Sequence, residues 1–471
     1  MKKLIAGILA LTLVCSAAVL PAAKELVPGV SVTASAETIS YVLTLTADKT
    51  ISGDLITTNN VNLNGHTLTV TGDFHMTAGT LTLGGGTLNV GGGFYFEGVG
   101  DRASTDVKSK AILNMTNAND VINVGGDFVW DMNSTASTSS TKMTKGVINI
   151  SGGFYDYTTT STQSFRPLAS SSLVVNFKGS GAKTIQPGYY SWFPKFSVSS
   201  DCGTLNVVDY FAVQSLQSNV TINTSNVSTG MLKLNGYNLT VNGSLTQDSN
   251  ITLSGGTLKV TGDIIAATGT TTVDSGTIDV GGSYYVKSLA SSGGRIVDAD
   301  STNVIVMNNA SGNIKVAGDF FYWSHGDTAG TFSAGTITIG GNFTDKGTTN
   351  NSRFYATGSH TVYLNGAYVQ TVSFAGTGRF YNLKLLYKKA DYTLPSTTCY
   401  VNLTEGSTSR TSTSTIKGDV NGDGKINFKD VVLLARYINN NSTTILTSNA
   451  DFDSNGTINS KDTVALAKSI L

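Results

Sequence analysis

The chain has 471 residues, and its 31 basic residues balance 31 acidic ones at a formal net charge of zero. This neutrality argues against a nucleic-acid partner, which requires a basic face. Glycine is abundant, with 52 residues, only 6 prolines occur, and 13% of the residues are charged. Few glutamates and many Thr, Val, Gly, Asn and Tyr residues favour strands and turns, and exclude a coiled coil, a polytopic membrane protein or a mostly helical fold. The length predicts at least two structural units.

The N-terminus has the pattern of a secretory signal. Lys2 and Lys3 precede an apolar run, and Ala34-Ser35-Ala36 has the small residues of a cleavage site. We therefore expect residues 1–36 to be a signal peptide and the protein to be extracellular. The apolar run is short for a membrane span and no second one follows, so we expect no membrane-spanning segment.

One phrase recurs along the body: an alternating β pattern, a Gly pair and then aromatic residues. Clear copies occupy residues 84–96, 120–130, 145–157, 275–286, 312–323 and 334–345, and weaker copies occupy 66–74, 238–245 and 256–264. The residue after the Gly pair recurs about every 20 positions, as from Phe74 to Phe94 and from Ile264 to Tyr284. That length is typical of one coil of a β-solenoid.

Physical chemistry favours the same architecture. Strands that alternate with period two bury one face, and a lone coil cannot do so, whereas stacked coils share the buried face and pair at ~4.8 Å. Glycine supplies positive φ angles at corners. We predict a mostly β fold with a β-solenoid, similar to a parallel β-helix, over residues 37–404, in two tandem halves of about 38–210 and 211–400. A β-sandwich is the structural alternative. The body resembles bacterial extracellular β-solenoid and β-helix proteins.

Cysteine and histidine often form disulfides or metal sites, but their positions in this chain do not indicate either. Cys202 and Cys399 lie in different halves of a repetitive chain, so stacking would keep them apart and we expect unpaired thiols. The four histidines show no metal-ligand spacing and are expected at the surface or at corners. They are His66, His75, His325 and His360.

The composition changes at residue 405. Residues 405–417 are rich in Ser and Thr, as in a flexible linker. Two loops of 12 residues follow, at 419–430 and 451–462. Each has oxygen-bearing side chains at positions 1, 3, 5, 9 and 12 and Gly at position 6, which is the spacing of a Ca²⁺ loop. Each brings three carboxylates to one cation and runs into an apolar helix. The sequence therefore predicts two Ca²⁺ ions, with folding linked to metal.

The duplicated loop-and-helix segment at 418–471 resembles a type I dockerin, the module by which secreted proteins of cellulosome-forming anaerobes bind cohesins of a scaffoldin. The resemblance implies two sets of Ca²⁺ ligands. The first set is Asp419, Asn421, Asp423, Asn427 and Asp430 with the Lys425 carbonyl. The second set is Asp451, Asp453, Asn455, Asn459 and Asp462 with the Thr457 carbonyl. It also implies cohesin contacts by Phe428, Lys429, Arg436, Ser460, Lys461 and Lys468.

The solenoid itself offers two kinds of candidate site. Aromatic residues recur at one place in each coil, where alternate rings point inward and outward. An outer strip of rings would suit stacking against sugars, and the candidates are Trp130, Tyr155, Tyr285 and Trp323. Two insertions at matching places in the halves carry acids and arginines. These weak catalytic candidates are Asp101, Arg102, Asp106, Arg295, Asp298 and Asp300.

Together these patterns predict a secreted, cellulosome-type or cell-surface component that binds cohesin through the C-terminal module. The solenoid is expected to bind plant cell-wall polysaccharide or to act in surface adhesion. Two alternatives stay open for it. In the first alternative, the solenoid is a polysaccharide-degrading enzyme, either a β-helix lyase or an O-glycosyl hydrolase. In the second, it is a passive spacer.

Overall fold

The structure is a computed structural model. It describes residues 36–97, 109–132, 142–158, 160–168, 170–292, 295–325, 330–349, 352–396, 398–409, 416–422, 426–440 and 445–470. For Ser291, Ser292, Arg295, Ile296 and Asn440 only the backbone is described.

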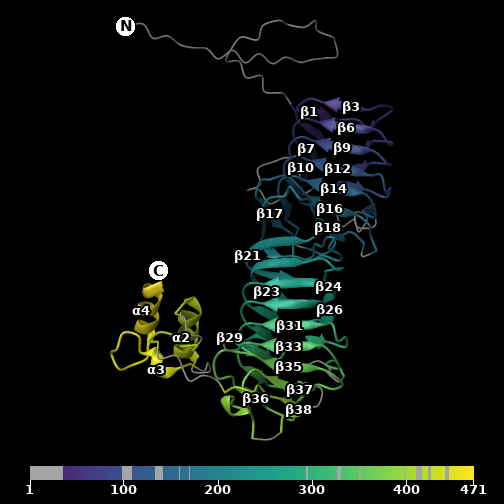
Figure 1. Ribbon diagram of the computed structural model, residues 1–471. Helices are drawn as coiled ribbons and strands as arrows, with labels where there is room; N and C mark the ends of the chain where they lie inside the picture. The colour runs from purple at the N-terminus through teal and green to yellow at the C-terminus, as the bar shows by residue number, and fades with distance from the viewer. Residues whose placement is uncertain are drawn as a thin grey trace, which may run out of the picture. The chain divides into compact units, whose positions relative to one another are not determined.

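The first half of the body is a three-sided coil, in which short strands from successive turns stack along each side (Figure 1). The first side contains β1 (Glu37–Ile39), β4 (Leu55–Thr57), β7 (Phe74–Met76), β10 (Phe94–Phe96), β13 (Phe128–Trp130), β15 (Phe154–Asp156), β17 (Lys183–Gln186) and β19 (Leu205–Val207). The second side contains β2 (Leu43–Thr44), β5 (Val61–Asn62), β8 (Thr80–Thr82) and β11 (Ile112–Asn114). The third side contains β3 (Lys49–Ile51), β6 (Thr67–Val70), β9 (Thr87–Val90), β12 (Val121–Val124), β14 (Val147–Ile150), β16 (Val174–Phe177) and β18 (Lys195–Val198).

The second half continues the coil, but several of its strands are long and run through the corners, so the sides merge into one sheet. Its first strands are β20 (Asp209–Tyr210), β21 (Val220–Thr229), β22 (Leu232–Lys233), β23 (Leu239–Gln247), β24 (Ile251–Val260), β25 (Ile264–Ala266), β26 (Thr270–Val280) and β27 (Tyr284–Val286). They are followed by β30 (Val304–Val306), β31 (Asn313–Val316), β32 (Phe320–Tyr322), β33 (Thr336–Ile339), β34 (Phe343–Asp345), β35 (Thr361–Leu364), β36 (Val372–Phe374), β37 (Phe380–Leu385) and β38 (Tyr400–Thr404).

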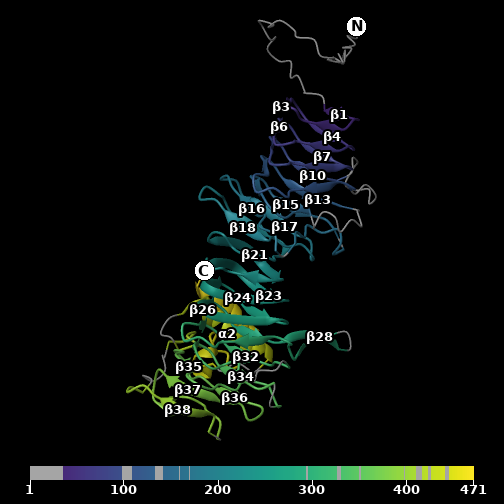
Figure 2. The ribbon, with the colours of Figure 1, turned by 90° about the vertical axis from the view of Figure 1, so that its right-hand side faces the viewer.

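Pairing between successive coils is parallel throughout these described strands, whereas a β-sandwich is built from antiparallel strands. The predicted mostly β fold with a solenoid body is therefore confirmed. One insertion departs from the coil: β28 (Ser288–Ser292) and β29 (Arg295–Ala299) form an antiparallel hairpin that stands out from the body (Figure 2). A short 3₁₀ helix, η1 (Lys389–Asp391), lies before β38. The C-terminal segment contains α2 (Phe428–Asn440), α3 (Thr447–Ala450) and α4 (Ser460–Ile470).

The repeated phrase sets the register of the coils. Phe94 pairs with Phe74 on one side and with Phe128 on the other, and Phe128 pairs with Phe154. Their rings are fully buried and form an internal ladder, in which the centroids of Phe128 and Phe154 are 5.6 Å apart and the planes are nearly parallel. The expectation of an inner set of stacked rings is confirmed, and each copy of the phrase extends one continuous core.

The Gly pair of the repeated phrase lets adjacent coils approach closely and does not supply positive φ angles. The φ angles of Gly125 and Gly340 are not positive. A Cβ atom on Gly125 would lie 2.2 Å from the Gly91 carbonyl oxygen, and one on Gly340 would lie 2.4 Å from the Ala317 oxygen. These glycines are required because adjacent coils approach closely at this corner. Positive φ explains other corners, such as Gly146 at 96°.

Side-chain ladders join the coils on the outside. Asp73 Oδ1 accepts a hydrogen bond from Gly93 N at 2.7 Å, and Asp127, Asp263 and Asp319 make the same contact one coil onward. On the third side, Asn123 Nδ2 donates to Asn89 Oδ1 at 2.8 Å and Asn123 Oδ1 accepts from Asn149. Several aspartates of this chain therefore accept hydrogen bonds from backbone N–H groups at the corner of the next coil.

His360 lies at one of the two expected kinds of place, a corner, but not at the surface. It lies at a corner just before β35, but its side chain is fully buried against Phe332 and Phe354. Neither ring nitrogen has a hydrogen-bond partner in the structure. Burial lowers the pKa of His360 to about 3, so the imidazole is neutral in the fold. Cys202 and Cys399 are free thiols.

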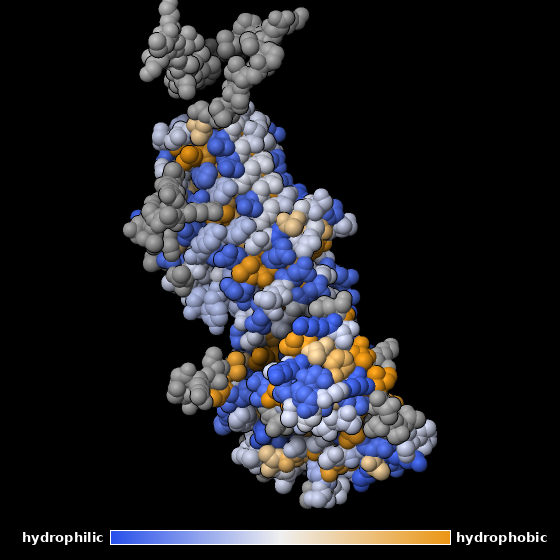
Figure 3. Space-filling model, turned by 90° about the vertical axis from the view of Figure 1, so that its left-hand side faces the viewer, coloured by the Kyte–Doolittle hydropathy of each residue, from blue (hydrophilic) through white to orange (hydrophobic). Residues whose placement is uncertain are grey.

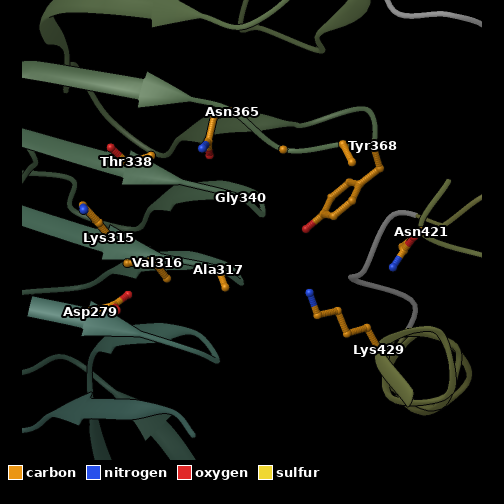
Figure 4. A pocket seen from close by; sticks show the side chains of 12 residues that line it. Asp279, Lys315, Val316, Ala317, Thr338, Gly340, Asn365, Tyr368, Asn421 and Lys429 are labelled. Atoms are coloured by element: carbon orange, nitrogen blue, oxygen red, sulfur yellow. The ribbon is translucent and has the colours of Figure 1, made fainter. Parts of the chain in front are cut away.

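The outer surface of the solenoid is predominantly polar. On the face drawn in Figure 3, the first half is mostly blue and white, and its orange areas are small and separate from one another. In the second half, Asp279, Lys315 and Thr338 lie side by side on β26, β31 and β33 because these strands pair in register (Figure 4). The coil thus presents regular rows of outward side chains that are spaced by one coil.

Candidate functional site

The second C-terminal loop brings three carboxylates together. Oxygen atoms of Asp451, Asp453 and Asp462 all lie within 4.8 Å of one another. Asp462 is buried in the first turn of α4, whereas Asp453 is exposed at the loop surface. Gly456 turns the loop with a φ of 84°. Three like charges this close repel one another unless a cation neutralises them, so the loop has the charge of a cation site.

The acid at position 12 organises each loop in the same way. Asp430 accepts hydrogen bonds from the N–H groups of Asn421 and Asn427, at 3.1 and 2.9 Å. Asp462 accepts from the equivalent N–H groups of Asp453 and Asn459, at 3.0 and 2.9 Å. Burial alone would raise the pKa of Asp462, but hydrogen bonds from the backbone N–H groups of Asp453, Asn459 and Phe452 together lower it. Both carboxyl groups are therefore held in place as acceptors.

The remaining ligands expected from the sequence fit a hard cation where the structure describes them. Asp419 and Asn421 are buried, and Asp430 lies with them in the first loop. Asn455, Thr457 and Asn459 lie in the second loop, where Asn459 Nδ2 donates to the Thr457 carbonyl oxygen. Carboxylate, amide and carbonyl oxygens are the ligands that Ca²⁺ takes. Asp423 and Lys425 lie outside the described residues.

Apolar packing joins the two loop-and-helix units. Val420, Leu434, Ala450 and Leu466 are fully buried together. Leu434 is on α2 and Leu466 is on α4, and these two helices contact each other. The cluster is small, so we expect the metal loops to contribute much of the stability of this segment.

Comparison with known families agrees with this geometry. Residues 417–471 match the family model described as the dockerin type I domain. The C-terminal segment is a dockerin type I domain. Type I dockerins bind calcium, a dockerin implies a cohesin partner, and dockerin-containing proteins are extracellular components of cellulosomes. No curated protein and no solved structure matches the chain. Within the described residues, no helix has the length and apolar character needed to span a membrane.

The dockerin exposes a similar stripe on each of its two long helices. On α2, Phe428 is 54% exposed and Val432 is 48% exposed, with Arg436 one turn later. On α4, Ser460, Val464 and Lys468 occupy the corresponding positions, and Val464 is 53% exposed. Lys429 and Lys461 are exposed beside the stripes. The sequence analysis missed the two valines, although their spacing of four residues from neighbouring candidates could have indicated them.

The aromatic candidates on the solenoid divide into one inner and three outer residues. Trp130 is fully buried, packs against Phe96 and Phe128, and donates its indole N–H to the Gln163 carbonyl oxygen at 2.8 Å. Its assignment to an outer strip is therefore wrong, because residues two apart on a strand share a face and Phe128 points inward. The other candidates, Tyr155, Tyr285 and Trp323, lie at outward positions and are partly exposed.

The outer rings meet neighbouring rings. Tyr155 stacks with Tyr157 at 6.0 Å between centroids. Tyr285 lies 6.3 Å from Phe321, and the Lys287 ammonium is 4.5 Å from the Tyr285 ring centroid.

The acidic candidates of the described residues contact basic side chains. Asp298 Oδ1 is 2.8 Å from the Lys287 ammonium, and Asp300 Oδ2 is 3.0 Å from His325 Nδ1. Asp298 lies on the β28–β29 hairpin, and Arg295 begins β29, where only its backbone is described. The other three candidates, Asp101, Arg102 and Asp106, lie outside the described residues.

A cluster of exposed tyrosines was absent from the sequence prediction. Tyr189 is 60% exposed and Tyr190 is 42% exposed, in the turn after β17. The ring centroids of Tyr189 and Tyr190 are 5.1 Å apart, and those of Tyr189 and Tyr210 are 5.2 Å apart. The Tyr-Tyr pair directly after Pro187-Gly188 is the sequence signal that could have found it, because a turn displays adjacent side chains to solvent.

Proposed function

We propose that the protein is a secreted component that binds a cohesin through its Ca²⁺-dependent dockerin and presents the solenoid as an arm that binds plant polysaccharide. The observation that carries the docking part is the matched pair of loops, in which Asp430 and Asp462 accept hydrogen bonds from N–H groups at equivalent loop positions. The signal-peptide pattern of residues 1–36, which includes only one described residue, supports export.

Two Ca²⁺ ions would be held by the ligand sets given above, and each ion would offset most of the negative charge of three carboxylates. Asp430 and Asp462 stand in the first turns of α2 and α4, so a loop closed around a cation fixes where each helix begins. Metal binding would thereby order the two exposed stripes relative to each other. This links cohesin binding to calcium through the fold of the dockerin.

The docking face would be the two stripes. Phe428, Val432 and Val464 supply exposed apolar contact, and Lys429, Lys461 and Lys468 supply surrounding positive charge. An apolar centre with a charged rim is the usual anatomy of a specific interface. The two stripes share a central valine but differ at Phe428 and Ser460.

The polysaccharide role of the solenoid is supported by its outward aromatic residues. Tyr155 and Tyr285 occupy equivalent outward positions in the two halves, with Tyr157 and Phe321 beside them. Rings that expose a flat face keep an apolar surface next to polar edges, which suits ligands with apolar faces and hydroxyl rims.

The docking proposal is tested by pull-down of the full chain on immobilised cohesins. The wild-type chain should bind the cohesins in Ca²⁺, and a chelator should abolish this binding. The double variant Asp430→Ala/Asp462→Ala should fail to bind at moderate Ca²⁺ concentration. Asp298→Ala, which removes an acid of the solenoid hairpin, is the matched control and should bind normally. Binding of every variant in chelator would overturn the proposal. The polysaccharide role is tested separately by affinity electrophoresis of the full chain in pectin, xylan and soluble cellulose derivatives.

A further inference from the structure

The exposed tyrosines form a strip across successive coils near the junction of the two halves. Tyr155 on β15 pairs in register with Gln186 on β17, and Tyr189 and Tyr190 follow Gln186 by a few residues. Tyr210 belongs to β20, on a later coil. Since coils stack at ~4.8 Å, these rings lie along the solenoid axis rather than around one coil.

The strip is held on a rigid support. The turn that carries Tyr189 and Tyr190 is closed by a hydrogen bond from Ser191 N to the Gly188 carbonyl oxygen at 2.8 Å. The Ser191 hydroxyl donates to the buried carboxyl group of Asp156. Tyr210 lies over Gly230, where a Cβ atom would approach the tyrosine hydroxyl within 2.1 Å. The exposed rings are therefore positioned before any ligand arrives, which lowers the entropy cost of binding.

Polar groups accompany the rings. The Arg166 guanidinium lies 4.4 Å from the centroid of the Trp192 ring, and the Trp192 indole N–H donates to the Pro167 carbonyl oxygen. Burial, together with the nearby Tyr189 and Asp248, raises the pKa of Tyr210 to about 12 against the opposing charge of Arg166. The phenol is thus a neutral hydroxyl at physiological pH, able to donate and accept.

We propose that Tyr189, Tyr190 and Tyr210 form a glycan-binding site in which the rings stack against sugar faces, with Tyr155 and Tyr157 extending the site by further subsites. This assignment rests on the proposed function and specifies where on the solenoid the polysaccharide binds. The ligand is a linear oligosaccharide lying along the solenoid axis, because the strip crosses coils. A carbohydrate is the occupant because tyrosines pair flat apolar faces with hydroxyl edges, and the charged groups of Arg166 and Asp248 lie near Tyr210.

The experiment uses the full chain and the pectin, xylan and cellulose derivatives named above, with affinity measured by electrophoresis and calorimetry. The test variant is Tyr189→Ala/Tyr190→Ala, the conservative variant is Tyr189→Phe/Tyr190→Phe, and the matched control is Tyr41→Ala, which removes a tyrosine that is 56% exposed at the first coil. A second comparison variant is Tyr285→Ala/Trp323→Ala. Circular dichroism and Ca²⁺-dependent cohesin binding check that each variant is folded.

The alanine variant should bind the preferred glycan at least about tenfold more weakly, which corresponds to ~1.4 kcal/mol. The phenylalanine variant should keep most of the affinity, Tyr41→Ala should match wild type, and affinity should rise with oligosaccharide length. Wild-type affinity in the alanine variant would overturn this site, and a loss only in Tyr285→Ala/Trp323→Ala would leave the proposed function standing elsewhere. Absence of wild-type binding to every glycan would overturn both. Self-association that the alanine variant abolishes would assign the strip to a second copy of the chain instead.

Discussion

The buried imidazole of His360 makes the solenoid sensitive to acid. The ring is fully buried, has no hydrogen-bond partner in the structure, and has its pKa lowered from 6.5 to about 3 by burial alone. In the unfolded chain the same group titrates near 6.5. Between pH 6.5 and 3 the unfolded state therefore binds more protons than the folded state, so stability is present above pH 6.5 and is lost as the pH falls.

The magnitude follows from the pKa difference. Each pH unit within the window costs about 1.4 kcal/mol, so a change from pH 6.5 to pH 5 should remove about 2 kcal/mol of local stability. His360→Leu removes the titrating group and also two buried nitrogens without partners. The variant should be at least as stable as wild type at pH 7.5, and its advantage should grow by about 2 kcal/mol at pH 5.

Hydrogen exchange of the β35 and β37 amides is the suitable assay, because it reports local free energies in a repeat protein that need not unfold in one step. The control is His325→Gln, since the His325 side chain is 77% exposed and its pair with Asp300 contributes little. If wild type and His360→Leu lose protection equally between pH 7.5 and pH 5, the imidazole is not buried in neutral form and the reasoning is refuted.

Three further predictions follow from the core, the ladders and the metal loops. Phe154→Ala should lower the local free energy of opening by about 3–5 kcal/mol in hydrogen exchange of the β13 and β15 amides, whereas Tyr155→Ala should cost far less, because only the first ring is in the core; equal costs would contradict the inward and outward assignment. Asn123→Ala should cost about 1–3 kcal/mol in hydrogen exchange of the β12 and β14 amides, since it leaves the amides of Asn89 and Asn149 without their partner, and unchanged protection would refute the ladder. A chelator should reduce the helical signal in circular dichroism and leave the β signal, and helices that persist without Ca²⁺ would argue against metal-linked folding.

Sequence reasoning succeeded where one repeated pattern sets the structure. The aligned copies of the phrase predicted that alternate rings point inward, and Phe94, Phe128 and Phe154 form this inner set. The same alternation rule also implies that Trp130 points inward with Phe128, so the error at Trp130 came from weighting residue type above register. The dockerin was recognisable because its ligand spacing is fixed by the geometry of a single ion.

The features that sequence reasoning missed depend on contacts between distant segments. The tyrosine strip combines residues from three separate coils, and no local pattern places Tyr189 beside Tyr210. The hydrogen bonds of the corner aspartates also join distant segments, because the partner of Asp73 is an N–H group 20 residues later. The role of the Gly pair could not be predicted for the same reason, since the close approach at Gly125 involves the preceding coil.

The most direct test of the account is calorimetric titration of the full chain with a cohesin domain as free Ca²⁺ is varied. The account predicts saturable one-to-one binding that strengthens with Ca²⁺, disappears in chelator, and weakens in a variant that carries both Val432→Asp and Val464→Asp on its exposed stripes. Binding of equal affinity with and without Ca²⁺, or no binding to any cohesin at saturating Ca²⁺, would contradict it.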